Sequence, residues 1–138
     1  MGSVNFWQVE KDLTDHLAAN LPAGIVAARV SYPNAPFITP NNLPWLRATI
    51  TAPEVIDRDA SGCYREYLGV FVVDVFYPKS KGSKAATEMA DAIAESFNSK
   101  AFAYSYCPEA DVQVIGQEDF WYHVQINAIY QYGSILEE

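Results

Sequence analysis

The segment 70–97, VFVVDVFYPKSKGSKAATEMADAIAESF, joins an apolar strand, a lysine-rich turn and a helical pattern, which is also the layout of a phosphate-binding loop. Such a loop has the form G-x-x-x-x-G-K-[ST], because its glycines allow backbone N–H groups to surround the phosphates. If Gly82 were the second glycine, the first would fall on Tyr77, and Ser83 precedes Lys84 in the reverse order. The segment therefore predicts a strand end, a turn at Gly82 and a helix capped by Ser83, and not a nucleotide site.

The side chains that could bind a metal or perform covalent catalysis are few and lie far apart in the sequence. His16 and His123 are the only histidines, and they belong to different predicted elements without the HxxxH or CxxC spacing of a zinc site. Cys63 and Cys107 have no nucleophile signature, so we interpret both as reduced, partly buried thiols, although a bridge between them stays open. The sequence therefore predicts no catalytic, metal-binding or cofactor-binding residue, and no enzyme.

Asp74 is the acidic residue that interrupts an otherwise apolar strand. As a functional group it would be a general base in a cleft. The structural interpretation instead pairs it with Arg47 on the neighbouring strand, or places it near the rim of the sheet. Because no second member of a catalytic set accompanies it, we favour the structural interpretation.

Composition and charge limit the class of protein and its partners. The chain has 138 residues, of which 50% are hydrophobic, and this is enough for one domain, 1–138, with its own core. The net charge of −8 argues against a protein that wraps DNA, but it does not argue against a passage along which DNA slides without binding. No apolar run reaches the roughly 20 residues of a membrane helix, and the N-terminus lacks a signal-peptide pattern. We therefore expect a protein with no membrane partner that is made and used in the cytoplasm.

Hydrophobic periodicity predicts two helices and several strands. The helices are expected at 4–21, with Ser3 as a cap, and at 84–97, where an apolar, alanine-rich stripe faces the sheet. Strands are expected at 24–33, 45–53, 63–78 and 120–133, with short strand candidates at 101–107 and 110–116. Short links between consecutive strands favour antiparallel pairing. The predicted fold class is therefore α+β, a mainly antiparallel sheet with two helices packed on it, in the order α-β-β-β-α-β-β.

Three segments are expected to lie outside the core. The Pro-rich stretch 33–44 is predicted to be a long, exposed, irregular loop with an apolar tip at Phe37 and Ile38. The second and third strands are predicted to form a β-hairpin whose exposed, charged tip spans 54–62. The tail 134–138 is expected to fray.

Three stretches together carry a family resemblance: PWLRATI at 44–50, GVFVVDVFYPKSKGSKAATEMADAIAESF at 69–97, and FWYHVQINAIYQY at 120–132. They resemble the small tail terminator, or tail completion, proteins of long-tailed phages. The shared features are an Asp-containing strand that ends in Pro, a Gly-containing turn, a helix of the A…ADAIA…F kind and a late strand with an aromatic start. The resemblance extends from about residue 4 to residue 132 and lies in hydrophobic patterns, not in catalytic signatures.

The resemblance implies a structural role in the virion tail. It implies a ring of this chain with itself, usually a hexamer, that sits on the tail tube, stops polymerisation of the tube protein and offers a surface to the head–tail connector protein. DNA would pass through the ring without specific binding, and neither a cofactor nor a reaction is implied. Assembly would take place in the host cytoplasm.

Assembly contacts are expected among aromatic residues outside the core, which are enriched at protein interfaces, and among exposed charged residues that could dock on a neighbour of opposite charge. The candidates are Arg47, Asp57, Arg58, Asp59, Arg65, Trp121, His123, Phe37, Lys79 and Lys81. Two other functions stay open. One is another head–tail connector protein of similar size, and the other is a stand-alone α+β domain that binds a small ligand, or acts as an enzyme, near Trp121 and Asp74.

Overall fold

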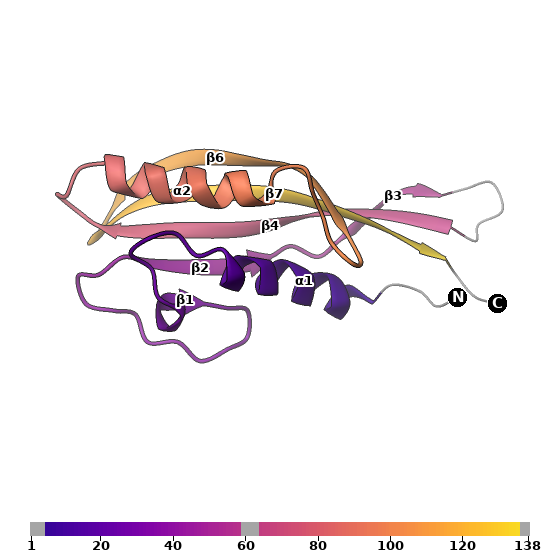
Figure 1. Cartoon of the computed structure of the whole chain (residues 1–138), viewed down its shortest axis with the longest axis horizontal. Helices are drawn as coiled ribbons and strands as arrows, with labels where there is room; N and C mark the ends of the chain where they lie inside the picture. The colour runs from indigo at the N-terminus through magenta and orange to yellow at the C-terminus, as the bar shows by residue number, and fades with distance from the viewer. Residues whose placement is uncertain (1–4, 59–63, 136–138) are drawn as a thin grey trace.

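The chain folds into one curled sheet with two helices, in a computed structural model that describes residues 5–58 and 64–135 (Figure 1). The described elements are α1 (Phe6–Ala19), a 3-10 turn η1 (Ala27–Arg29), β1 (Val30–Ser31), β2 (Trp45–Ile50), β3 (Glu54–Arg58), β4 (Tyr64–Pro78), α2 (Lys84–Phe97), β5 (Lys100–Ala101), β6 (Tyr106–Glu118) and β7 (Trp121–Ile135). The strand order is β1-β2-β4-β7-β6-β5, and β3 also pairs with β4. Only the short β1–β2 pair among these is parallel. The predicted α+β fold with a mainly antiparallel sheet is therefore confirmed.

Both helices pack on the same face of the sheet. Apolar residues of α1 and α2 join one core cluster with the inward side chains of the strands, among them Leu13, Ile93 and Val73. The two helices also touch each other, since His16 Nε2 of α1 lies 2.8 Å from the Ser96 carbonyl oxygen of α2. The apolar stripe predicted for 84–97 is thus the buried face of α2, and the predicted bounds of this helix are confirmed.

The caps of the helices differ in detail from the prediction. The N-cap of α1 is Asn5, whose backbone N–H donates to the side-chain oxygen of Gln8 at 2.9 Å, and the proposed cap Ser3 lies outside the described residues. Ser83 occupies the N-cap position of α2 as predicted, but its side chain forms no capping hydrogen bond. Its carbonyl oxygen instead accepts a hydrogen bond from the Thr87 hydroxyl at 2.8 Å.

The centre of the sheet is a long antiparallel ladder between β4 and β7. The register runs from Tyr64 opposite Ile135 to Pro78 opposite Trp121, so the two strands pair over their whole length. Side chains alternate between the faces, and Val124, Ile126 and Tyr130 of β7 therefore point into the core under the helices. The opposite face of the same strands carries no helix in the described part of the chain.

Several strand predictions need correction. The segment 24–33 is mostly irregular, because residues 27–29 form a 3-10 turn and only Val30–Ser31 pairs with β2. The stretch 54–62 was predicted to be an exposed loop, but 54–58 is strand β3, which continues the hairpin by pairing with 65–68 of β4. The predicted strand at 101–107 is divided between β5 and the start of β6, which continues to Glu118.

The remaining predictions concern the loop 33–44, the C-terminal tail and membrane insertion. Residues 33–44 contain no helix or strand, as predicted. Residues 134–135 of the tail predicted to fray belong to β7, and 136–138 lie outside the described residues. In the part of the chain that the structure describes, neither α1 nor α2 is long and apolar enough to span a membrane.

Candidate functional site

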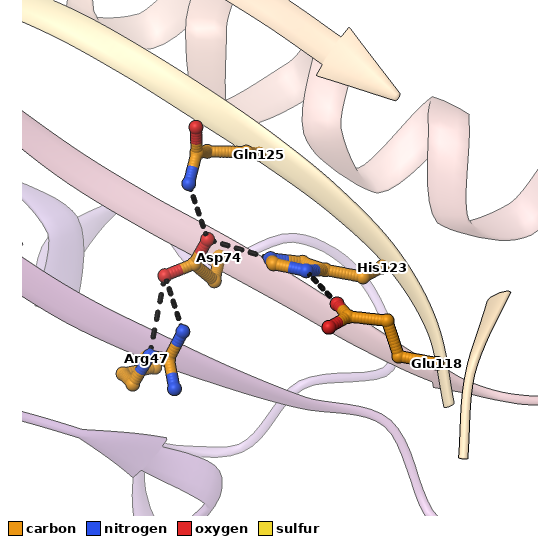
Figure 2. A network of polar contacts seen from close by, with 5 residues as sticks. All are labelled: Arg47, Asp74, Glu118, His123 and Gln125. Carbon is orange, nitrogen blue, oxygen red and sulfur yellow. Dashed lines mark hydrogen bonds and ion pairs between the residues drawn. The ribbon is translucent and has the colours of Figure 1, made fainter. Parts of the chain in front are cut away.

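The face of the sheet that the helices leave uncovered carries a connected set of polar side chains, which we call the Asp74 network: Arg47, Asp74, Glu118, His123 and Gln125 (Figure 2). Asp74 lies at its centre and is 2% exposed. Its Oδ2 accepts hydrogen bonds from Nε and Nη2 of Arg47, both at 3.2 Å. Its Oδ1 lies 2.6 Å from His123 Nε2 and accepts a hydrogen bond from the Gln125 amide at 3.0 Å. The predicted pair of Asp74 with Arg47 is therefore confirmed.

His123 connects this carboxylate to a second one. Its Nδ1 lies 2.5 Å from Oε1 of Glu118, at the end of β6. A neutral imidazole has a single N–H and can donate to only one carboxylate. The buried Asp74 carboxylate is stabilised by its ion pair with Arg47 and by the hydrogen bond from the Gln125 amide.

Strand register explains why these side chains meet. Arg47, Asp74 and Gln125 lie opposite one another on β2, β4 and β7. His123 is two residues from Gln125 on the same face of β7, and Phe76 lies opposite His123. Alternation along three paired strands thus places the whole network on one face.

A stack of aromatic rings covers one end of the Asp74 network. Phe37 from the Pro-rich loop stacks on Trp45, Trp45 stacks on Phe76, and Phe76 stacks on His123, with ring centroids 5.3, 4.3 and 4.5 Å apart. Trp121 meets Trp45 edge-on at 6.0 Å. Arg29 joins the end of the loop to the segment after α1, because its guanidinium donates to the carbonyl oxygens of Pro44 and Gly24. The stack thus links the loop to His123 of the network.

The arrangement suits structural positioning better than catalysis. Every oxygen of Asp74 already accepts hydrogen bonds, so the carboxylate has no free lone pair directed at a substrate. Within residues 5–58 and 64–135, no group of three or more His, Cys, Asp or Glu side chains is placed to hold a metal ion. Cys107 is a free thiol, and burial raises its pKa to about 11, so it is a poor nucleophile at neutral pH. Cys63 lies outside the described residues.

The predicted contact residues fall into two groups at opposite ends of the molecule. Arg47, His123, Phe37 and Trp121 meet in the network and the stack, and Lys79 and Lys81 lie exposed on the turn beside them. Arg65, on β4, pairs across the sheet with Arg58 of β3 at the far end, next to Asp57. Asp59 lies outside the described residues. His123 is 6% exposed and Phe37 is half-buried, so both support the surface from beneath more than they form it.

Some exposed apolar residues were not among the predicted contacts. Phe120 is 74% exposed in the turn between β6 and β7, and β3 exposes Val55 and Ile56. Val114 and Ile115 are exposed on β6, which pairs with β5 only at residues 106–107. The pairs Val114–Ile115 and Val55–Ile56 could have indicated these exposed positions in the sequence. Neighbouring residues in a strand point to opposite faces, so in a strand at the edge of a sheet both members of such a pair cannot enter one core.

The fold and this surface together define an α+β protein with a hydrogen-bonded polar network, an aromatic stack and exposed apolar residues at both ends. The sequence pattern of the family described as phage tail terminator protein matches residues 8–104, which is more than half of the chain. The chain therefore belongs to the phage tail terminator protein family, and its structural role in phage tails follows from that membership.

A solved structure of another protein has a similar fold. Its TM-score to this chain is 0.62 at 28% sequence identity, and the similarity covers 94% of this chain and 92% of the other. The likeness therefore extends over β6 and β7, beyond the residues that the family pattern matches. A search of curated proteins finds no match.

Proposed function

We propose that this protein caps the phage tail tube, stops its polymerisation and provides the surface on which the head is joined. It acts as a ring of identical subunits, for which we propose a hexamer, and has no enzymatic activity. Its partners are further copies of itself, the tail tube protein and the head–tail connector protein. Assembly takes place in the host cytoplasm.

Family membership is the observation that carries this proposal, and the surface of the molecule supports it. Apolar side chains are exposed at both ends, Phe120 and Leu43 at one and Val55 and Ile56 at the other. Large exposed apolar groups on a small domain favour contacts with other proteins. A subunit of a head-to-tail ring needs two different contact patches for its neighbours, and these two ends supply them.

The charge of the chain supports a ring through which DNA passes. With a net charge of −8, each subunit repels the phosphate backbone, so DNA is not retained in the channel. Subunits that share this negative charge also repel one another. Ring formation must therefore rest on local apolar and charge-complementary contacts.

A tube-length assay tests the proposal. Purified tube protein is polymerised with increasing amounts of this chain, and tube lengths are measured by electron microscopy. We expect the mean length to fall and one end of each tube to carry extra density. Unchanged lengths at an excess of this chain would reject the capping function, and binding to isolated heads without any effect on tubes would favour a different connector protein.

A further inference from the structure

A groove lies at the end of the sheet where β4 ends and β7 begins. It has a volume of about 540 Å³ and is lined by Thr39, Pro40, Asn41, Asn42, Lys79, Ser80, Phe120 and Trp121. We call it the Phe120 groove. Its walls come from the Pro-rich loop, the turn after β4 and the turn between β6 and β7, so three segments distant in sequence build it.

The Phe120 groove is formed in advance of any partner. The Lys79 backbone N–H donates to the Phe120 carbonyl oxygen at 3.1 Å, and the Lys79 ammonium lies over the Phe120 ring, 5.8 Å from its centroid. Glu118, two residues before Phe120, is held by His123 of the Asp74 network. Trp121 is fixed by its edge contact with Trp45. Fixed walls reduce the ordering cost of binding.

The chemistry of the groove selects an acidic segment with apolar side chains. Phe120 is 74% exposed and Trp121 is half-buried, and together with Pro40 they offer apolar contact. Lys79 faces this surface, and Lys81 lies exposed on the same turn. In the described part of the chain, no ion pair engages either lysine. In a chain with net charge −8, such a local excess of positive charge is complementary to other parts of the same protein.

Strand β3 presents a matching segment. Glu54, Val55 and Ile56 are consecutive and all exposed, with Val55 at 39% and Ile56 at 48%. A register shift between Val55 and Asp57 leaves Ile56 without a partner residue on β4. Such bulges re-aim side chains and are common at sheet edges and functional sites. Glu54 is complementary in charge to Lys79. The exposed Val55 and Ile56 side chains are complementary to the apolar surface of Phe120 and Trp121.

The two surfaces cannot meet within one chain. Glu54 lies opposite Leu68 of β4, and Lys79 follows the end of that strand, 11 residues further on. At about 3.3 Å per residue, the two sites are about 36 Å apart along the sheet. Figure 1 shows β3 at one end of the molecule and the end of β4 at the other.

We propose that the Phe120 groove of one subunit binds the β3 segment 54–56 of a second copy of this chain, with Lys79 facing Glu54. This contact joins two different patches, so it is heterologous and propagates from subunit to subunit until a ring closes. It rests on the proposed function, because it supplies the contact between subunits of the proposed ring.

Disulfide trapping and charge exchange test the contact. In a Cys63→Ser background, full-length chain with Val55→Cys is mixed with chain carrying Phe120→Cys, in concentrated solution and on capped tubes, and cross-chain disulfides are quantified. We expect a product in the mixture that neither variant gives alone. Lys79→Glu in the groove partner, or Glu54→Lys in the β3 partner, should lower its yield about tenfold, and combining the two should restore it.

Matched variants separate a specific contact from general charge effects. Lys84→Glu and Glu95→Lys change exposed residues of α2 that line neither surface, and both should leave the yield unchanged. Absence of the mixed disulfide, or equal yields from all charge variants, would overturn the proposed contact.

The tube-length assay, run on the same variants, keeps the two proposals apart. A chain that forms no mixed disulfide but still shortens tubes would retain the capping function without this contact. Shortening that Lys79→Glu abolishes and Glu54→Lys does not restore would assign the groove to the tube or connector protein and reject the contact between copies. A mixed disulfide without any effect on tube length would support the contact and reject the capping function.

Discussion

Gly69 provides the sharpest test of how the sheet is packed. It lies on β4 directly opposite Tyr130 of β7, whose side chain is fully buried. A Cβ atom at position 69 would lie 2.4 Å from the Tyr130 hydroxyl oxygen and 2.5 Å from its Cζ. Ordinary contacts between such atoms are about 3.5–4.0 Å, so the ring would have to move by about 1 Å. That shift would also strain the hydrogen bond that the hydroxyl donates to the Thr51 carbonyl oxygen at 2.8 Å.

The expected cost of Gly69→Ala follows from these terms. Overpacking costs about 1–3 kcal/mol, and loss of the hydrogen bond costs about 1 kcal/mol. Replacing glycine by alanine within a strand returns about 0.5–1 kcal/mol of backbone entropy. We therefore expect the free energy of unfolding to fall by about 2 kcal/mol, with Tm lower by several degrees.

Guanidinium unfolding followed by tryptophan fluorescence measures this change, and a second background identifies its cause. In a Tyr130→Leu variant, the ring and hydroxyl atoms that the added methyl group would approach most closely are absent. There, Gly69→Ala should cost close to nothing or be slightly stabilising. The contrary outcome is that Gly69→Ala raises the free energy of unfolding of the native protein, or lowers it equally in both backgrounds. In either case the close approach of Tyr130 would not be the reason that position 69 requires glycine.

Three further predictions concern titratable side chains. Asp74→Asn leaves Arg47 without its buried carboxylate partner, so it should lower the free energy of unfolding by about 3 kcal/mol, whereas Asp111→Asn at an exposed position of β6 should change it by less than about 0.5 kcal/mol. Burial lowers the pKa of His16 below its usual 6.5. The unfolded chain therefore binds the proton first, and stability should decline as pH falls below that value, by more in the native protein than in His16→Gln when unfolding is measured from pH 7 to 5. Burial also raises the pKa of Cys107 to about 11, so in a Cys63→Ser variant at pH 8 the thiol should react with Ellman's reagent about two orders of magnitude more slowly than in denaturant. Equal rates in both states would show that Cys107 is accessible.

The parts of the fold that follow local patterns could be predicted from the sequence. The apolar stripe of α2 and the alternation in β2 and β7 each reflect a single element that buries one face, so the local pattern of apolar residues is enough to predict which side chains are buried. The Asp74–Arg47 pair could also be predicted, because it joins two strands of one hairpin. An acid within an apolar strand needs a partner on the next strand at the same level.

The contribution of His123 depends on register and could not be predicted. Its contact with Asp74 requires the exact pairing of β7 with β4, two strands far apart in sequence. Its contact with Glu118 requires the tight turn at Asp119 and Phe120, and these residues lack the Asn-Gly or Asp-Gly signal of a two-residue hairpin. The length of β6 was missed for a similar reason. Pro108 and Gly116 usually interrupt strands, but here the ladder with β7 shifts register near each of them and continues.

The continuous pairing of β4 with β7 has a mechanical consequence. Each strand is 15 residues long, and the ladder runs from the β3 end to the Phe120 groove without a hinge. A pull that separates the two ends loads the backbone hydrogen bonds of this ladder together, in shear, and not one after another. The ladder therefore resists extension along its length, so the distance between β3 and the Phe120 groove changes little under tension.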